Sequence, residues 1–180
     1  MVSEMMKHDH DQLSELLGDL QTALGTGDRV KAFELLDLFW ARLAVHIRAA
    51  HLCLFPAILN APPESFRKAA GVPALKEVEA AIDKLRGDHN FFMHQLSEAV
   101  KRFRPVLSQS EHPERSANTL EDIRTRVLAV AERLNAHDAL EEKQVYRWPA
   151  KILSPPELER LFASLRRELE NLPPRFARSL

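Results

Sequence analysis

The sequence predicts an all-α protein, arranged as an up-down-up-down four-helix bundle with an additional short C-terminal helix. Leu, Ala, Glu and Arg are abundant among its 180 residues, and all four favour helix. The chain has five glycines and one tyrosine, and its β-branched residues never cluster, which argues against sheets. Apolar residues recur every three or four positions in four long segments, which is the pattern of helices that bury one face in a bundle.

Breaks rich in proline, glycine and turn-forming residues separate these segments, at residues 25–28, 60–73, 104–115 and 148–158. The four apolar stripes run from Met6 to Leu24, from Ala32 to Cys53, from Leu75 to Phe103 and from Leu120 to Trp148. A shorter fifth segment, 157–172, also carries leucines at helical spacing. We therefore expect residues 1–150 to form the bundle. Residues 151–180 are expected to form a helix and tail that pack on the bundle or on a partner, such as the second copy of a homodimer.

The bulk composition excludes several classes of protein. The formal net charge is −1 with both signs mixed along the chain, so we expect neither nucleic acid nor a membrane surface as a partner. The single cysteine rules out an internal disulfide. No run approaches the ~18 apolar residues of a membrane span, and the first residues lack the pattern of a signal peptide. The expected location is the cytoplasm.

Each of the four apolar stripes is interrupted once by a histidine, at His10, His46, His89 and His137. A buried imidazole is costly unless its nitrogens are satisfied. One such residue is commonly a core histidine with ordinary hydrogen-bond partners, but one in every helix of a bundle is hard to explain in that way. Four imidazoles that converge in a bundle core predict a metal site or a haem site. Neutral imidazole suits iron, zinc, copper and nickel.

A carboxylate accompanies the last histidine. Glu141 follows His137 by four residues, so both side chains lie on one helix face, one turn apart. A glutamate on a core stripe is costly unless it binds a cation or pairs with a base. Glu141 is therefore a fifth candidate ligand, and the alternative is that it lies at the edge of the stripe and pairs with Lys or Arg.

These residues lie in four short motifs: "HDHDQL" with His10, "VHIRAAHLCLFP" with His46, "GDHNFF" with His89, and "HDALEEKQVYRWP" with His137 and Glu141. In this order and at these separations, the set resembles the hemerythrin-like family of HHE cation-binding domains over roughly residues 4–150. The resemblance implies a non-haem, usually di-iron site with oxo or carboxylate bridges. It also implies a role in binding or sensing O2, nitric oxide or peroxide, or in handling iron.

Helix two departs from the family pattern, which expects a glutamate four residues after His46. That position is Ala50, so the stripes offer one carboxylate against about four positive charges for a divalent pair, a poor balance in a low-dielectric core. Two further histidines, His51 and His94, each follow a site histidine by five residues. A step of five turns ~140° on an ideal helix, and a π-bulge would shorten that angle. Alternatively, His51 approaches from the flank, or both histidines lie at a helix edge.

Three neighbours of the candidate ligands have ordinary interpretations. Asp9 and Asp88, each just before a candidate histidine, are either partners of the ligand histidines or exposed acids. They do not lie on a stripe, so exposure is favoured. Tyr146 is expected to pack at a helix end. No residue therefore stands out as a proton donor, and a binding or sensing role is favoured over catalysis.

The sequence thus predicts a non-haem metal-binding protein with His10, His46, His89, His137 and Glu141 as ligands. Because Ala50 replaces the expected acid, the site is either mononuclear or an altered pair that recruits His51 as a further ligand. Iron is the first candidate, mononuclear or dinuclear, and another divalent metal is possible. A small diatomic molecule or peroxide would bind at an open position. Two alternatives remain. One is a haem with two axial histidines, for which Ala49 and Ala50 would make room. The other is a metal-free or weakly metal-binding helical scaffold.

Overall fold

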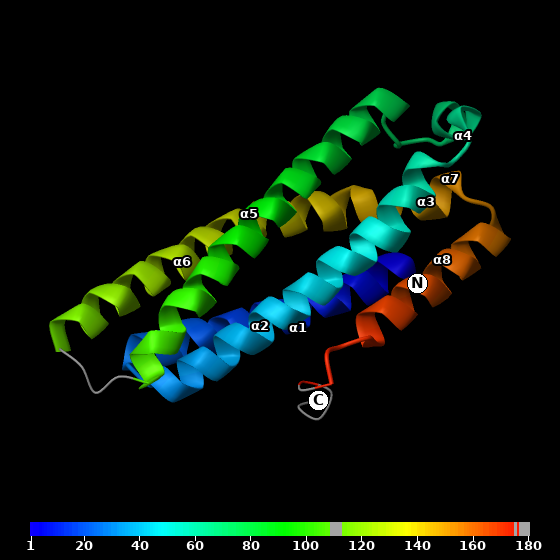
Figure 1. Cartoon of the computed structure of the whole chain (residues 1–180). Coiled ribbons are helices and arrows are strands. Elements are labelled where there is room, and N and C mark those ends of the chain that lie inside the picture. Colours follow the sequence, from blue (N-terminus) through cyan, green and yellow to red (C-terminus); the bar gives the residue numbers. More distant parts are fainter. Residues whose placement is uncertain (109–112, 175, 177–180) are drawn as a thin grey trace.

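The computed structural model describes residues 1–108, 113–174 and 176. It confirms the predicted all-α fold class, since none of the described residues lies in a β-strand. Four long helices form the bundle: α1 (Val2–Thr26), α2 (Arg29–Ala49), α5 (Leu75–Ser108) and α6 (Pro113–Lys143). The shorter α-helices are α3 (Phe55–Leu59), α4 (Pro63–Lys68), α7 (Pro149–Ile152) and α8 (Pro155–Glu170), with a π-helical turn at Ala50–Leu54 and a 3-10 helix at Val145–Arg147. Figure 1 shows the chain reversing direction between successive long helices.

The first reversal follows from two adjacent residues. Gly27 ends α1 in the left-handed region, with φ 77°, a conformation that glycine adopts without steric cost. Asp28 then caps α2, because its side chain accepts a hydrogen bond from the Lys31 backbone N–H at 3.1 Å. Both residues fall in the predicted break at 25–28, and they bring α1 and α2 together as a tight hairpin.

The end of α5 differs from the sequence prediction, and the end of α2 is irregular. Helix α5 continues through the predicted break at 104–115 as far as Ser108, with Pro105 inside it. A proline removes one backbone hydrogen bond, and here it does so within the last turn, where the loss does not end the helix. Helix α2 ends at Ala49, but the helical path of the chain continues beyond it. A π-helical turn, Ala50–Leu54, follows and leads directly into α3.

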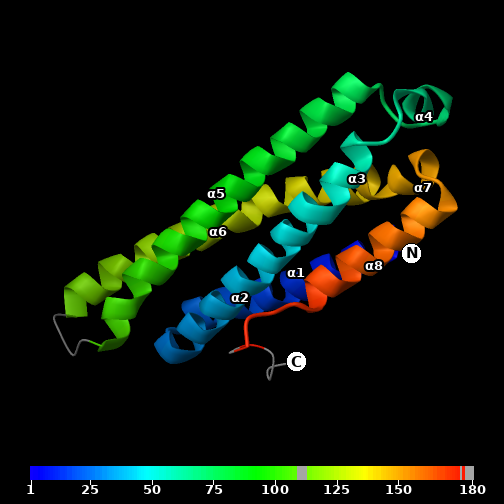
Figure 2. The ribbon, with the colours of Figure 1, turned by 45° about the vertical axis from the view of Figure 1, so that its right-hand side comes forward.

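The predicted fifth helix, α8, packs against the four-helix bundle of the same chain, beside α2, as Figures 1 and 2 both show. Ser154 and Glu157 form a capping box at its start, and Leu161 and Leu165 are buried. Arg48 of α2 forms an ion pair with Glu168 at 2.9 Å. The end of the predicted tail, at residues 175 and 177–180, lies outside the described residues.

Two apolar clusters fill the bundle, one on either side of a polar layer. Along α1, Leu13 belongs to the first cluster and Met6 to the second, with His10 between them. The other long helices follow the same rule, because each changes from one cluster to the other close to its site histidine. The candidate ligands therefore occupy one layer of the bundle.

One continuous helical stretch, Arg29–Leu59, is long and apolar enough to cross a membrane by length and composition alone. The prediction that no run of the chain approaches a membrane span does not anticipate this stretch. The helix that forms the core of a bundle passes the same test, and this stretch buries Leu36, Phe39 and Leu43 inside the protein. Its apolar character is thus explained by its place in the bundle.

Candidate metal centre

The structure brings the five main candidate ligands together. His10 comes from α1, His46 from α2, His89 from α5, and His137 and Glu141 from α6. All five are buried, with 3% exposure or less. Residues from four separate helices thus meet in the polar layer, and the alternative of Glu141 at an exposed stripe edge is wrong.

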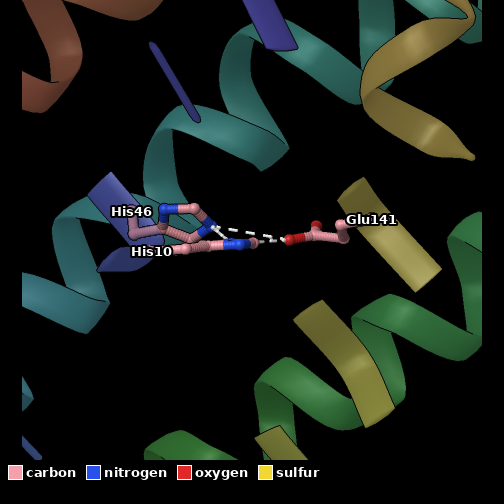
Figure 3. A group of neighbouring side chains, drawn as sticks. All are labelled: His10, His46 and Glu141. Atoms are coloured by element: carbon pink, nitrogen blue, oxygen red, sulfur yellow. Dashed lines mark hydrogen bonds and ion pairs between the residues drawn. The ribbon is translucent and has the colours of Figure 1, made fainter. Parts of the chain in front are cut away.

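The five residues form two trios that share Glu141. One trio is His10, His46 and Glu141, and the other is His89, His137 and Glu141; within each, the potential ligand atoms lie within 4.8 Å of one another. The Glu141 Oε2 atom lies 3.2 Å from His10 Nε2, 3.6 Å from His46 Nε2 and 3.5 Å from His137 Nε2. Figure 3 shows how the two rings of the first trio face the carboxylate.

Each site histidine turns Nε2 toward the centre, and an outer partner contacts its Nδ1. The partners are Glu142 on His10 at 3.1 Å, Asp9 on His46 at 2.8 Å, His51 on His89 at 2.8 Å and Asp88 on His137 at 3.3 Å. An ionised carboxylate only accepts hydrogen bonds, so three of the four Nδ1 atoms carry the proton. A neutral ring then presents the Nε2 lone pair inward, which is the tautomer that binds a metal.

Asp9 and Asp88 are buried, with 8% and 2% exposure, so the favoured prediction that they are exposed is wrong. Their contacts with His46 and His137 agree with the alternative, that they are partners of the candidate ligands. A residue that directly precedes a stripe histidine lies at the edge of the apolar face. In a bundle, the neighbouring helix packs against that edge. Asp9 also pairs with Arg42 at 3.1 Å, and Asp88 with Arg133 at 2.6 Å.

A near-repeat in the sequence could have revealed this arrangement. A "DH" pair occurs at 9–10 and at 88–89, followed by "RLAVH" at 42–46 and "RLNAH" at 133–137. In each hairpin, the aspartate of the first helix contacts both the arginine and the histidine of the second. The two halves of the site therefore have the same construction up to the histidine, and they differ four residues later, at Ala50 and Glu141.

The π-helical turn suggested by the five-residue step is present at Ala50–Leu54. His51 lies in this turn, with Nε2 2.8 Å from His89 Nδ1, and is in neither trio. The structure therefore places His51 behind a candidate ligand, and its role as a direct ligand stays a prediction. His94 follows His89 in a regular helix and is exposed.

Tyr146 is a site residue that sequence reasoning missed. Its side chain is 1% exposed, and its hydroxyl lies 2.9 Å from His10 Nε2 and 3.3 Å from His46 Nε2. The hydroxyl also donates a hydrogen bond to Glu141 Oε2. The expectation of helix-end packing alone is wrong, and a proton donor is present in the cluster after all.

The pKa values show how strongly these groups interact in the metal-free protein. Burial disfavours the charged form of His46, yet the hydrogen bonds that its ring donates to the carboxylates of Asp9 and Glu141 raise its pKa to about 10. Burial likewise opposes ionisation of Glu141, but contacts with His10, His137 and His46 lower its pKa well below the usual value. His89 has no carboxylate on either ring nitrogen, and burial lowers its pKa to about 3.

Two buried oxygens in the described part of the chain have no hydrogen-bond partner: Glu141 Oε1 and Asp138 Oδ1. Asp138 Oδ1 lies 3.7 Å from His10 Nε2, so both oxygens belong to the cluster. An unpaired buried polar atom is costly, and a cation would satisfy both. Imidazole nitrogens with carboxylate oxygens are also a donor set that suits iron, manganese and zinc. The residues present therefore fit a metal.

The acids around the cluster also correct the expected charge balance. Only Glu141 was counted on the stripes, but Asp9, Asp88 and Asp138 stand beside the histidines. Carboxylates that contact ligand imidazoles offset positive charge without binding the metal themselves. Asp9 and Asp88 are themselves paired with Arg42 and Arg133, so Asp138 is the one of these three acids that adds negative charge to that of Glu141.

A helical bundle with two buried His-carboxylate trios in its core defines a class of protein that can hold cations between its helices. The sequence profile of the family "Hemerythrin HHE cation binding domain" matches residues 1–149. The chain belongs to this family, and the resemblance drawn from the motifs is confirmed. Comparison with curated proteins and with solved structures gives no match.

Proposed function

We propose that the protein holds a non-haem, dinuclear metal centre and uses it to bind or sense a small ligand such as O2, nitric oxide or peroxide. One observation carries the proposal: the two trios share Glu141, whose Oε2 contacts three of the histidines while its Oε1 has no partner. A carboxylate with one occupied and one free oxygen between two histidine pairs is suited to bridging two ions.

Iron is the metal that we propose first. Bundle cores with histidine and glutamate hold pairs of iron or manganese ions, and the same donors accept other divalent metals. When bound, such a pair would supply an open coordination position for a small ligand, because four imidazoles and one carboxylate do not saturate two ions. The protein's own contribution is to fix the donors, to hold the tautomers and to exclude bulk water from the site.

The metal-free scaffold has one observation in its favour, since many of the cluster's polar atoms contact one another. The two unpaired oxygens of Glu141 and Asp138 weigh against it. Haem fits less well, because the Nε2 atoms of His10 and His46 lie 3.3 Å apart and those of His89 and His137 lie 3.1 Å apart. A porphyrin between either pair would have to separate side chains that are in contact here.

The cytoplasm is the location that we propose. The long apolar stretch, Arg29–Leu59, supplies His46 and His51 to the interior of the bundle. A membrane-spanning role would place that polar site in lipid, where its aspartate and arginine partners would be costly.

Metal analysis tests the proposal. Protein that is purified without added metal and then loaded anaerobically with ferrous iron should bind about two ions per chain. Glu141→Gln keeps the shape of the shared side chain but removes its charge, and should lose most of the bound metal. The matched control, His94→Ala, changes an exposed histidine and should bind as the wild type does. A wild type that binds no more iron than Glu141→Gln would refute the metal centre.

The small-ligand role needs a separate measurement. Adding nitric oxide or O2 to the anaerobic ferrous protein should change its visible spectrum, in proportion to the bound iron. A fully loaded centre whose spectrum stays the same with every one of these ligands would leave the metal site standing and refute the binding role.

A further inference from the structure

The two halves of the site differ at one position. Ala50 and Glu141 each follow the second histidine of their hairpin by four residues, but only Glu141 has ligand atoms. Ala50 is completely buried, and it belongs to the same apolar cluster as Tyr146. The hairpin of α1 and α2 therefore supplies no carboxylate at this position, and the Tyr146 hydroxyl joins Glu141 Oε2 as a second oxygen beside both His10 and His46.

The chain places Tyr146 there by a local break. On a continuous helix, Tyr146 would point ~140° away from Glu141, which it follows by five residues. Helix α6 instead ends at Lys143, and Gln144 has non-helical angles of φ −127° and ψ −71°. A short 3-10 helix, Val145–Arg147, then begins, so that the ring turns back into the core. Its chain neighbours Val145 and Trp148 are buried in the same apolar cluster as Tyr146.

Around the Tyr146 hydroxyl, hydrogen-bond acceptors outnumber donors when His10 and His46 are neutral. The Nδ1 protons of His10 and His46 face Glu142 and Asp9, so both Nε2 atoms present lone pairs. The single phenol proton is donated to Glu141. Two imidazole lone pairs, a phenol oxygen and a carboxylate oxygen then converge with no further donor among them, and a cation at their common centre would bind all four.

We propose that the Tyr146 oxygen is a direct ligand of the metal held by His10, His46 and Glu141. This inference rests on the proposed metal centre. On binding, the phenol O–H bond is replaced by an oxygen–metal bond and the proton is released to solvent. The resulting site has two nitrogen and two oxygen donors, with a phenolate that favours a ferric ion.

The inference also separates the roles of the two metal positions. The second trio cannot have a phenolate, because the chain contains one tyrosine. Behind His89 it has the neutral imidazole of His51 instead. The position held by His89 and His137 therefore has fewer protein donors, and it is the one left open to a small ligand.

Resonance Raman spectroscopy of the ferric protein tests the inference. A phenolate bound to ferric iron gives a charge-transfer band in the visible region, and excitation in that band enhances the ring vibrations. Wild type grown with ring-deuterated tyrosine should show these vibrations shifted, and the single tyrosine makes the assignment unambiguous. Tyr146→Phe should lose the band and the enhanced vibrations, while His94→Ala should keep both.

Iron content, measured on the same samples, separates the possible failures. Two irons per chain in the wild type, without tyrosine vibrations, would overturn the inference and leave the metal centre in place. A wild type without bound iron would overturn both. The isotope shift is measured on wild-type protein, so the test does not depend on the folding of Tyr146→Phe.

Discussion

At the scale of single residues, the nitrogen that each histidine offers to the centre is selected by the partner of its other nitrogen. Asp9 illustrates this, because it contacts His46 Nδ1 at 2.8 Å and is itself held by Arg42 at 3.1 Å. The contact raises the pKa of His46 and lowers that of Asp9, although burial opposes the ionisation of the carboxyl group. A metal that binds His46 must therefore displace a proton even above neutral pH.

Asp9→Asn should change the number of protons that are released when metal binds. Without the carboxylate, the pKa of His46 falls from about 10 toward its usual 6.5, so about one proton fewer is released when metal binds near pH 8. Metal affinity should also fall about 10- to 100-fold, because the ring loses its orienting partner. Calorimetry in buffers of different ionisation enthalpy measures both quantities.

The control for this change is Asp11→Asn, which alters an exposed aspartate paired with Lys7. It should release as many protons as the wild type. If Asp9→Asn and the wild type released the same number, Asp9 would not hold a proton on His46.

At the scale of elements, irregular turns rather than regular helices complete the site. The π-helical turn Ala50–Leu54 brings His51 against His89, and the break after Lys143 brings Tyr146 against His10. Such irregularities are frequent at functional sites, and both follow directly after a helix that carries a candidate ligand.

His51→Ala tests the π-helical turn. It removes the partner of His89 Nδ1, so the His89 ring loses its orientation and metal affinity should drop about 10- to 100-fold. His94→Ala is the matched control, since it also removes a histidine five residues after a site histidine, but from a regular helix. Competition with a coloured chelator measures both affinities. Equal affinities in the two variants would show that the turn has no role in the site.

The sequence predicts the site residues that lie on regular helices better than those that depend on irregular turns or on neighbouring helices. The four histidines and Glu141 were found because they interrupt apolar stripes of constant spacing, which periodicity reveals. Asp9 and Asp88 are harder to place, because their partners lie on neighbouring helices and the apolar stripe of one helix carries no information about the next helix. Tyr146 was missed because its direction depends on the backbone angles of Gln144, which no periodic pattern predicts.

At the scale of the whole molecule, the cluster joins two hairpins. His10 and His46 belong to the hairpin of α1 and α2, and His89, His137 and Glu141 to that of α5 and α6. Metal bound through Glu141 would therefore hold the halves together, and a ligand that binds only the folded state stabilises it by mass action. The stability of the whole chain should thus depend on metal and on pH together.

The pH dependence of the metal-free protein follows from two histidines with opposite shifts. His89 has a pKa lowered from 6.5 to about 3, so the unfolded chain binds more protons in that range and stability rises with pH through it. His46 has a pKa raised from 6.5 to about 10, so its contribution is complete below 6.5 and is lost as the pH rises toward 10. From these two groups, the metal-free protein should be most stable near pH 6.5.

Metal should change this profile, because it binds neutral histidine and competes with protons. At about 1,000 times its dissociation constant, metal adds about 4 kcal/mol, which raises the melting temperature of a chain of this size by about 8–16 °C. The increment should be small near pH 5, where protons compete, and should grow toward about pH 9. Thermal melts with metal and with chelator, compared across this range, measure it. Glu141→Gln should show little increment at any pH. An increment that is the same at every pH, or that survives in Glu141→Gln, would mean that metal stabilises the chain somewhere other than between the two hairpins.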